Sequence, residues 1–167
     1  QMKRTVALEI AIRALDLRGE VIVPSYTFVA TAHALQWQEI TPIFADIDPA
    51  THVLDPEAVR RMITSRTTGI LAVHLWGRPA PVEELAAIAS TRGLKLMYDA
   101  SHAFGCSRGG IAIGNFGECE VFSFHATKCY NTIEGGAVAC NDAAYAELLN
   151  GYKNFGFHAD EEIREVG

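Results

Sequence analysis

Two hydrophobic patterns alternate along this chain of 167 residues. Short runs that are apolar at nearly every position are typical of strands buried on both faces. We expect such strands at 21–23, 43–45, 70–75, 94–98, 120–124 and 136–140. In the longer segments between them, apolar residues recur every three or four positions, which indicates helices that bury one face. We expect helices at 5–17, from about 28, after Pro56, from Pro81 and at about 142–153.

Capping residues support several of these boundaries. Asp55-Pro56 is a favourable pair for the cap and the first position of a helix. Ser25 or Thr27 can cap the second helix through a side-chain oxygen. Gly19 and Gly93 are placed to end helices, because glycine adopts the left-handed conformation that often follows a last helical turn.

The alternation of helices with strands that are apolar throughout predicts an α/β fold. Strands buried on both faces need a covering layer on each side, and the crossover helices between parallel strands supply those layers. We therefore expect a three-layer α/β/α sandwich built on a mostly parallel sheet. No internal repeat or linker divides the sequence, so residues 1–167 are expected to form one domain.

Composition excludes several classes of protein. The 14 Lys and Arg against 20 Asp and Glu give a formal net charge of −6. An acidic chain without a basic cluster is not expected to bind nucleic acid or an anionic membrane. The apolar run at 70–73 is far shorter than the ~20 residues of a membrane span. With no secretory signal visible, we expect a cytoplasmic protein.

The cysteines give little indication of a metal site. No C-x-x-C pair occurs among Cys106, Cys119, Cys129 and Cys140. Tetrahedral zinc sites usually take two ligands from one short turn, so we expect no metal. Reduced thiols, most of them small buried hydrophobes, are the interpretation we favour.

Polar side chains follow the ends of four predicted strands. The segments just beyond these strands are 24–28, 74–77, 99–102 and 123–128. Ligands of open parallel sheets bind outside the carboxyl ends of the strands. We therefore expect Asp99, Lys128 and the nearby hydroxyls and aromatic rings to lie along one edge of the sheet.

Two common kinds of site are absent from the sequence. Neither G-x-G-x-x-G nor G-x-x-x-x-G-K-[ST] follows a predicted strand, and the glycines at 109–114 have a different spacing. Nicotinamide and ATP sites are therefore not favoured. No G-x-S-x-G turn occurs either, which argues against a serine hydrolase of the common kind.

Lysine and aspartate on neighbouring strand ends suit pyridoxal phosphate. The amine of Lys128 can form an imine with the cofactor's aldehyde. The carboxylate of Asp99 can hold a proton on the pyridine nitrogen, which makes the ring an electron sink. The phosphate needs hydroxyls and backbone N–H groups at a helix start, and the ring needs a flat side chain against which to stack.

An ordered set of motifs makes this interpretation more specific. The set is VIVPSYTFVAT at 21–31, DASHAFG at 99–105, GNFG at 114–117, FSFHATK at 122–128, EGGA at 134–137 and KNFG at 153–156. In this order and spacing the sequence resembles the DegT/DnrJ/EryC1/StrS family of PLP-dependent sugar aminotransferases. That family has the aspartate-aminotransferase fold (fold type I), so the resemblance implies the large domain of a PLP transferase.

The resemblance also implies roles for individual residues. Lys128 matches the lysine that binds pyridoxal 5'-phosphate covalently and moves the proton during transamination. Asp99 matches the partner of the pyridine nitrogen, and Phe28 matches the aromatic residue that stacks on the ring. Ser123 and Thr5 match positions that contact the phosphate.

His102 matches a position close to the hydroxyl side of the cofactor ring. Family substrates are nucleotide-linked keto sugars, with glutamate as the usual amino donor, and the enzymes form homodimers. Some relatives that carry histidine in place of the lysine are dehydratases, so Lys128 favours an aminotransferase.

The sequence departs from the family at its start and in its length. Lys3-Arg4 stands where the family usually has a small pair of residues before the threonine. Relatives are longer at both ends, so we expect a truncated large domain without the C-terminal small domain. A second hypothesis is therefore a non-catalytic domain that keeps the fold and acts, if at all, by binding or self-association.

Structural roles remain open for four of the candidates. Asp99 could cap the turn that follows its strand, and Ser123 could satisfy backbone groups. Phe28 could pack in the core under its helix, and His102 could be a hydrogen-bonded structural histidine.

Overall fold

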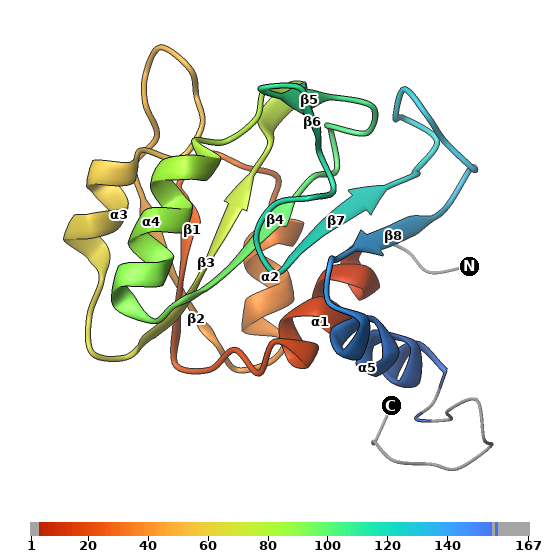
Figure 1. Cartoon of the computed structure of the whole chain (residues 1–167), viewed down its shortest axis with the longest axis horizontal. Helices are drawn as coiled ribbons and strands as arrows, with labels where there is room; N and C mark the ends of the chain where they lie inside the picture. Colours follow the sequence, from red (N-terminus) through yellow and green to blue (C-terminus); the bar gives the residue numbers. More distant parts are fainter. Residues whose placement is uncertain (1–3, 155, 157–167) are drawn as a thin grey trace.

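A six-stranded sheet lies between two layers of helices (Figure 1). The computed structural model describes residues 4–154 and 156. The strands of the sheet are β1 (Glu20–Pro24), β2 (Thr41–Ala45), β3 (Thr67–Val73), β4 (Lys95–Asp99), β7 (Cys119–Ser123) and β8 (Gly136–Ala139). The helices are α1 (Arg4–Ala14), α2 (Ala30–Gln36), α3 (Pro56–Met62), α4 (Val82–Arg92) and α5 (Ala143–Lys153).

The strand order is β2-β1-β3-β4-β7-β8, and every neighbouring pair is parallel except β7 and β8. The prediction of a three-layer sandwich on a mostly parallel sheet is confirmed. Strand order reverses at β1, which has β2 on one side and β3 on the other. Ligands of such sheets bind near this kind of reversal, at the carboxyl ends of the strands.

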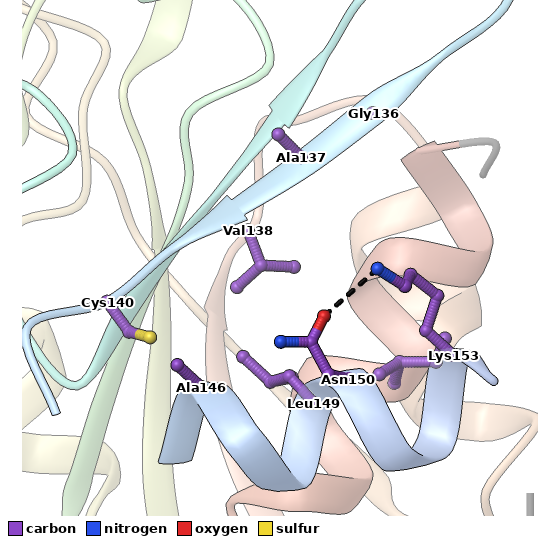
Figure 2. Close-up of a pocket in the computed structure, with 9 residues that line it drawn as sticks. Gly136, Ala137, Val138, Cys140, Ala146, Leu149, Asn150 and Lys153 are labelled. Carbon is purple, nitrogen blue, oxygen red and sulfur yellow. Dashed lines mark hydrogen bonds between the residues drawn. The ribbon is translucent and has the colours of Figure 1, made fainter. Parts of the chain in front are cut away.

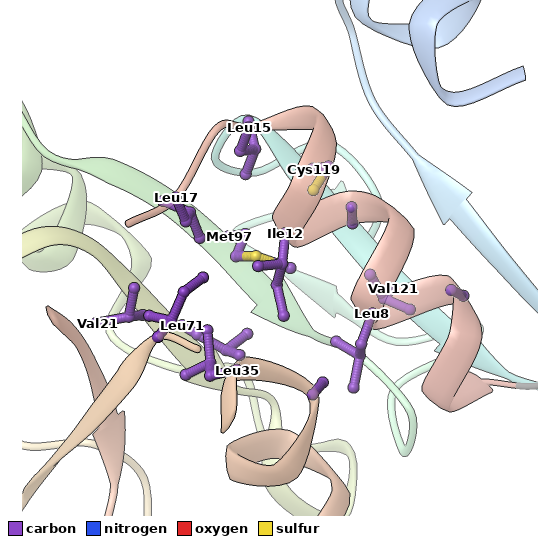
Figure 3. Packing of buried hydrophobic residues seen from close by; sticks show 14 of the residues in the cluster. Leu8, Ile12, Leu15, Leu17, Val21, Leu35, Leu71, Met97, Cys119 and Val121 are labelled. Carbon is purple, nitrogen blue, oxygen red and sulfur yellow. The ribbon is translucent and has the colours of Figure 1, made fainter. Parts of the chain in front are cut away.

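Each face of the sheet carries its own hydrophobic core. On one face α1, α2 and α5 cover a cluster that includes Leu8, Ile12 and Val121 (Figure 3). On the other face α3 and α4 cover a cluster that includes Leu85 and Tyr98. The described helices have at most 11 residues, and none is long and apolar enough to cross a membrane.

The capping predictions had mixed outcomes. Asp55 caps α3 by accepting hydrogen bonds from two backbone N–H groups, and Gly93 ends α4 in the left-handed conformation with φ 64°. The first helix ends at Ala14 rather than near Gly19, because Asp16 adopts a φ of 55° and turns the chain away.

The start of the second helix was predicted wrongly. α2 begins at Ala30 after Val29, whose side chain makes no capping bond. Thr27 does not cap it, because its hydroxyl lies 3.0 Å from the hydroxyl of Thr31 instead. Residues 25–29 therefore form a loop between β1 and α2, and this loop carries Phe28.

Two short elements at the edge of the sheet were not predicted. A 3-10 turn, η1 (Leu75–Gly77), follows β3, and the hairpin β5–β6 (Ser107–Arg108 and Ile111–Ala112) follows β4. The hairpin occupies the glycine-rich stretch at 109–114, where Gly109 and Gly110 both adopt positive φ. These glycines therefore serve a turn between two strands.

Candidate active site

A cavity of about 570 Å³ opens at the carboxyl ends of the strands. Its lining residues come from α1, from the loops after β1 and β4, and from the hairpin that joins β7 to β8. They are Thr5, Phe28, His102, Ser123, His125, Thr127, Lys128, Glu134 and Gly135. The structure thus brings five of the six predicted site residues to one cavity, and the sixth, Asp99, is buried at the end of β4.

Lys128 lies in the turn that joins β7 to β8. Beyond β7 the two chain segments stay paired, with Phe124 N–H donating to the Gly135 carbonyl at 2.8 Å and Ala126 N–H to the Ile133 carbonyl at 2.7 Å. The backbone N–H of Lys128 closes a turn by donating to the carbonyl of His125 at 2.9 Å. The hairpin therefore holds the half-buried lysine at the cavity wall.

Asp99 is fully buried, and hydroxyl groups bind both of its carboxylate oxygens. Oδ2 accepts a hydrogen bond from Thr31 Oγ1 at 2.8 Å. Oδ1 accepts from Ser101, from Oγ at 2.5 Å and from the backbone N–H at 3.1 Å. The turn-capping contact that was an alternative role is therefore present through Oδ1, alongside the contact of Oδ2 with α2. Together these donors fix the orientation of the carboxylate in an apolar surrounding.

Two hydroxyl groups line the cavity, one from strand β7 and one from helix α1. Ser123, at the end of β7, is 3% exposed, and its Oγ accepts a hydrogen bond from the N–H of His125 at 3.4 Å. Thr5 lies in the first turn of α1, where backbone N–H groups and the helix dipole favour an anion. Ser123 thus satisfies a backbone group, as its alternative role required, and also lines the cavity.

Phe28 is 60% exposed and precedes α2, so it does not pack in the core as its alternative role required. A phenyl ring that lines a cavity while exposed offers a surface for a flat ligand.

His102 is held by the loop that follows β3. Its Nδ1 accepts a hydrogen bond from the backbone N–H of Trp76 at 3.3 Å. The neutral ring therefore carries its proton on Nε2, and Nε2 is a hydrogen-bond donor. Trp76 makes this contact from a left-handed backbone conformation with φ 54°, which is uncommon for a residue other than glycine. The contact supports the structural role considered for His102, and the same residue lines the cavity.

Sequence reasoning gave no chemical role to four of the lining residues. His125 Nδ1 lies 2.9 Å from Thr127 Oγ1, and His125 Nε2 lies 3.9 Å from Glu134 Oε1. Gly135 is the fourth. The signal that could have found them is their place in two of the ordered motifs, His125 and Thr127 in FSFHATK and Glu134 and Gly135 in EGGA.

A buried polar network supports the loops around the cavity. Glu120 and His74 are fully buried, and His74 Nε2 lies 3.0 Å from Glu120 Oε2. His74 Nδ1 accepts the N–H of Ala80 at 2.9 Å, so Nε2 carries the proton that is donated to Glu120. Glu120 Oε1 also accepts two backbone N–H groups, those of Gly114 at 2.8 Å and Phe116 at 2.7 Å. One carboxylate thus connects the GNFG turn to the loop that carries Trp76.

The chemistry of the donor set fits pyridoxal phosphate. Among the lining residues in the described part of the chain, Lys128 supplies a primary amine, and Ser123 and Thr5 supply hydroxyls. Asp99 supplies a carboxylate held by three hydrogen bonds, and Phe28 supplies an exposed ring. An aldehyde, a phosphate, a ring nitrogen and a flat ring each find a matching group here.

Comparison with known proteins gives the same family as the motifs. Residues 3–166 match the DegT/DnrJ/EryC1/StrS aminotransferase family. The dTDP-4-amino-4,6-dideoxy-D-glucose transaminase of Shigella dysenteriae is 42% identical over 163 residues, which cover 98% of this chain and 44% of that protein.

Solved structures are similar over nearly the whole chain. DesI, crystallised in the presence of its TDP-sugar product, is 47% identical with a TM-score of 0.93, covering 99% of this chain and 42% of that one. DesV of S. venezuelae, in complex with a ketimine intermediate, is 34% identical with a TM-score of 0.91, covering 99% and 45%. The chain thus spans less than half the length of these relatives. Its sheet is that of sugar aminotransferases, and the chain belongs to the DegT/DnrJ/EryC1/StrS aminotransferase family.

Proposed function

We propose that this chain carries the cofactor site of a PLP-dependent enzyme that transaminates a nucleotide-linked keto sugar, with an amino acid such as glutamate as donor. The observation that carries the proposal is the convergence of Lys128, Ser123 and Thr5 on one cavity, beside the buried carboxylate of Asp99. The relatives that act on dTDP- and TDP-linked sugars support the substrate class.

Pyridoxal phosphate supplies an aldehyde that binds amines covalently and a ring that accepts an electron pair. Lys128 Nζ is the group that binds the aldehyde and later takes up and returns a proton. A lysine amine does this only when it is unprotonated.

Asp99 holds the proton on the ring nitrogen. Hydrogen bonds from Thr31 and Ser101 orient this fully buried carboxylate, so its negative charge keeps a fixed position. Fixed charge in a low dielectric stabilises the protonated nitrogen more strongly than a mobile surface carboxylate does.

The remaining residues bind and orient. Thr5 and Ser123 hold the phosphate through their hydroxyls, and the start of α1 adds backbone N–H groups. Phe28 would cover one face of the ring. His102, whose proton lies on Nε2 in the neutral form, would donate a hydrogen bond to the ring's hydroxyl oxygen.

Self-association of the chain forms part of the same proposal. Large apolar side chains near the cavity are exposed, among them Phe28, Val29, Phe104, Tyr130 and Ile133. Apolar side chains gathered around a site commonly mark an interface. A homodimer would cover them, and sedimentation at increasing concentration tests this, since a single monomeric species throughout would refute it.

The cofactor step is tested with pyridoxal phosphate itself. We expect a visible absorption band on addition of the cofactor, and borohydride reduction followed by peptide mapping should locate the adduct on Lys128. Lys128→Ala should abolish the band. Lys153→Ala is the matched control, because Lys153 lies on α5 and is bonded to Asn150 away from the cavity.

Labelling of surface lysines alone, or an unchanged band in Lys128→Ala, would overturn the proposal and leave the non-catalytic domain as the better hypothesis. If the cofactor binds at Lys128, formation of a keto acid from glutamate in the presence of a nucleotide-linked keto sugar tests the substrate class. Failure of this second step alone would refute the substrate class and leave the cofactor site intact.

A further inference from the structure

Two cysteines lie opposite each other at the base of the hairpin that carries Lys128. β7 and β8 are antiparallel, with Glu120 paired to Ala139 and Val121 to Val138. The next position outward in this register pairs Cys119 with Cys140. Both are free thiols in the structure.

The hydrogen-bond pattern fixes the kind of pair that these residues form. Phe124 N–H donates to the Gly135 carbonyl at 2.8 Å, which makes Phe124 and Gly135 a hydrogen-bonded pair. Such pairs alternate along an antiparallel ladder, so Glu120 and Ala139 are also hydrogen-bonded and the cysteines form a non-hydrogen-bonded pair. In these pairs the Cα atoms are about 4.5 Å apart, within the range of about 4.4–6.8 Å that a disulfide spans.

Both side chains lie on the face of the sheet that α1 and α5 cover. Cys119 packs in the core cluster with Val121 (Figure 3), and Cys140 packs against the same cluster. Figure 2 shows Cys140 beside Ala146 of α5, at the edge of a second cavity of about 300 Å³. The hydroxyl of Tyr145 lies 3.6 Å from the Cys119 sulfur, so α5 covers the Cys119 thiol.

We propose that Cys119 and Cys140 are a dithiol that oxidises to a disulfide and so closes the segment that carries Lys128. The oxidant is a low-molecular-weight disulfide of the glutathione class. The half-buried Cys140 thiolate attacks one sulfur of oxidised glutathione, forms a mixed disulfide and releases one glutathione thiolate. Cys119 then attacks the Cys140 sulfur and releases the second glutathione, so that two thiols are oxidised and one disulfide is reduced.

Cys119 needs no contact with solvent in these two reaction steps, because it reacts only with the Cys140 sulfur. Burial raises the pKa of both thiols, that of Cys119 to about 12. The thiolate is the attacking species, so oxidation should be slow near neutral pH and should become faster as the pH rises.

The loop closed by the cross-link would contain most of the residues that line the proposed cofactor cavity. Residues 119–140 contain Ser123, Lys128 and Glu134, which line it. A bond across the base of the hairpin keeps β8 paired with β7 when the chain fluctuates. The disulfide would form in this hairpin whether or not the proposed reaction takes place.

Thiol counting after incubation with oxidised glutathione tests the proposal. The chain has four cysteines, so titration under denaturing conditions should fall from four thiols to two. The protein should lose the mass of two hydrogen atoms, and proteolysis should yield linked peptides that contain Cys119 and Cys140. Dithiothreitol should restore all four thiols.

Matched variants separate this pair from the other cysteines. Cys140→Ser, at a half-buried position, should abolish the linked peptides, whereas Cys106→Ser and Cys129→Ser should retain them. Cys119→Ala should also abolish the linked peptides, and circular dichroism would show that this variant folds. Four unreacted thiols, a stable glutathione adduct at Cys140 without cross-linking, or linkage through Cys106 or Cys129 would overturn the proposal.

Discussion

Replacing Glu120 with glutamine tests the buried network around the cavity. The substitution keeps the volume of the side chain, and its amide oxygen can still accept the N–H groups of Gly114 and Phe116. Its NH₂ group then faces His74 Nε2, which lay 3.0 Å from the original oxygen. Since His74 Nδ1 already accepts the N–H of Ala80, Nε2 carries a proton, and two donors meet.

The histidine cannot relieve this conflict by moving its proton. A proton on Nδ1 would meet the N–H of Ala80 at 2.9 Å, so one pair of donors always clashes. Losing a hydrogen bond to a charged group costs about 1.5–3 kcal/mol, and a buried donor without a partner costs about 1–3 kcal/mol. A neutral amide costs less to bury than a carboxylate, which offsets part of this loss of stability. We expect Glu120→Gln to lower the free energy of unfolding by about 2–4 kcal/mol.

Urea unfolding followed by circular dichroism measures this loss as a lower midpoint with an unchanged slope. Glu57→Gln is the matched control, because Glu57 is exposed on α3 and pairs only with the exposed Arg60 among the described residues. It should change the free energy of unfolding by less than about 0.5 kcal/mol. A midpoint for Glu120→Gln equal to that of this control would show that His74 Nε2 does not donate to Glu120.

Two further substitutions test neighbouring contacts. Gly117→Ala should destabilise the fold by about 2–4 kcal/mol, because φ is 62° and an added Cβ would lie 2.4 Å from the Leu96 carbonyl oxygen. Urea unfolding measures this loss of stability. A loss of less than about 1 kcal/mol would mean that the turn moves to accommodate the methyl group. Thr31→Val removes the hydroxyl donor to Asp99 Oδ2 at unchanged volume and should cost about 1.5–3 kcal/mol. An unchanged midpoint for Thr31→Val would show that Asp99 does not depend on α2 for its orientation.

The convergence of the candidate residues could be predicted because it depends on strand direction. Parallel strands end at the same edge of a sheet, so residues that follow β1, β4 and β7 are brought together whatever the details of packing. Phe28, His102 and Lys128 meet at one cavity for this reason. The helix cap at Asp55 was predictable too, because an N-cap is a contact between residues two and three positions apart.

Contacts between distant residues could not be predicted in the same way. Thr31 binds Asp99 across 68 positions, and His74 binds Glu120 across 46. In the sequence Glu120 stands at the start of a predicted strand, two positions after another glutamate, and nothing distinguishes its partner from other histidines. The start of α2 was mistaken because Thr27 forms a tertiary contact with Thr31 in place of a local cap.

The sequence by itself determined the α/β class, the parallel sheet, the family and the residues that follow each strand, because these depend on local apolar periodicity and on ordered motifs. Only the tertiary structure decided that Asp99 is oriented by α2, that Glu120 joins the GNFG turn to His74, and that Cys119 faces Cys140. Strand register and helix docking bring these groups together, and both result from packing of the whole core rather than from any short stretch of the chain.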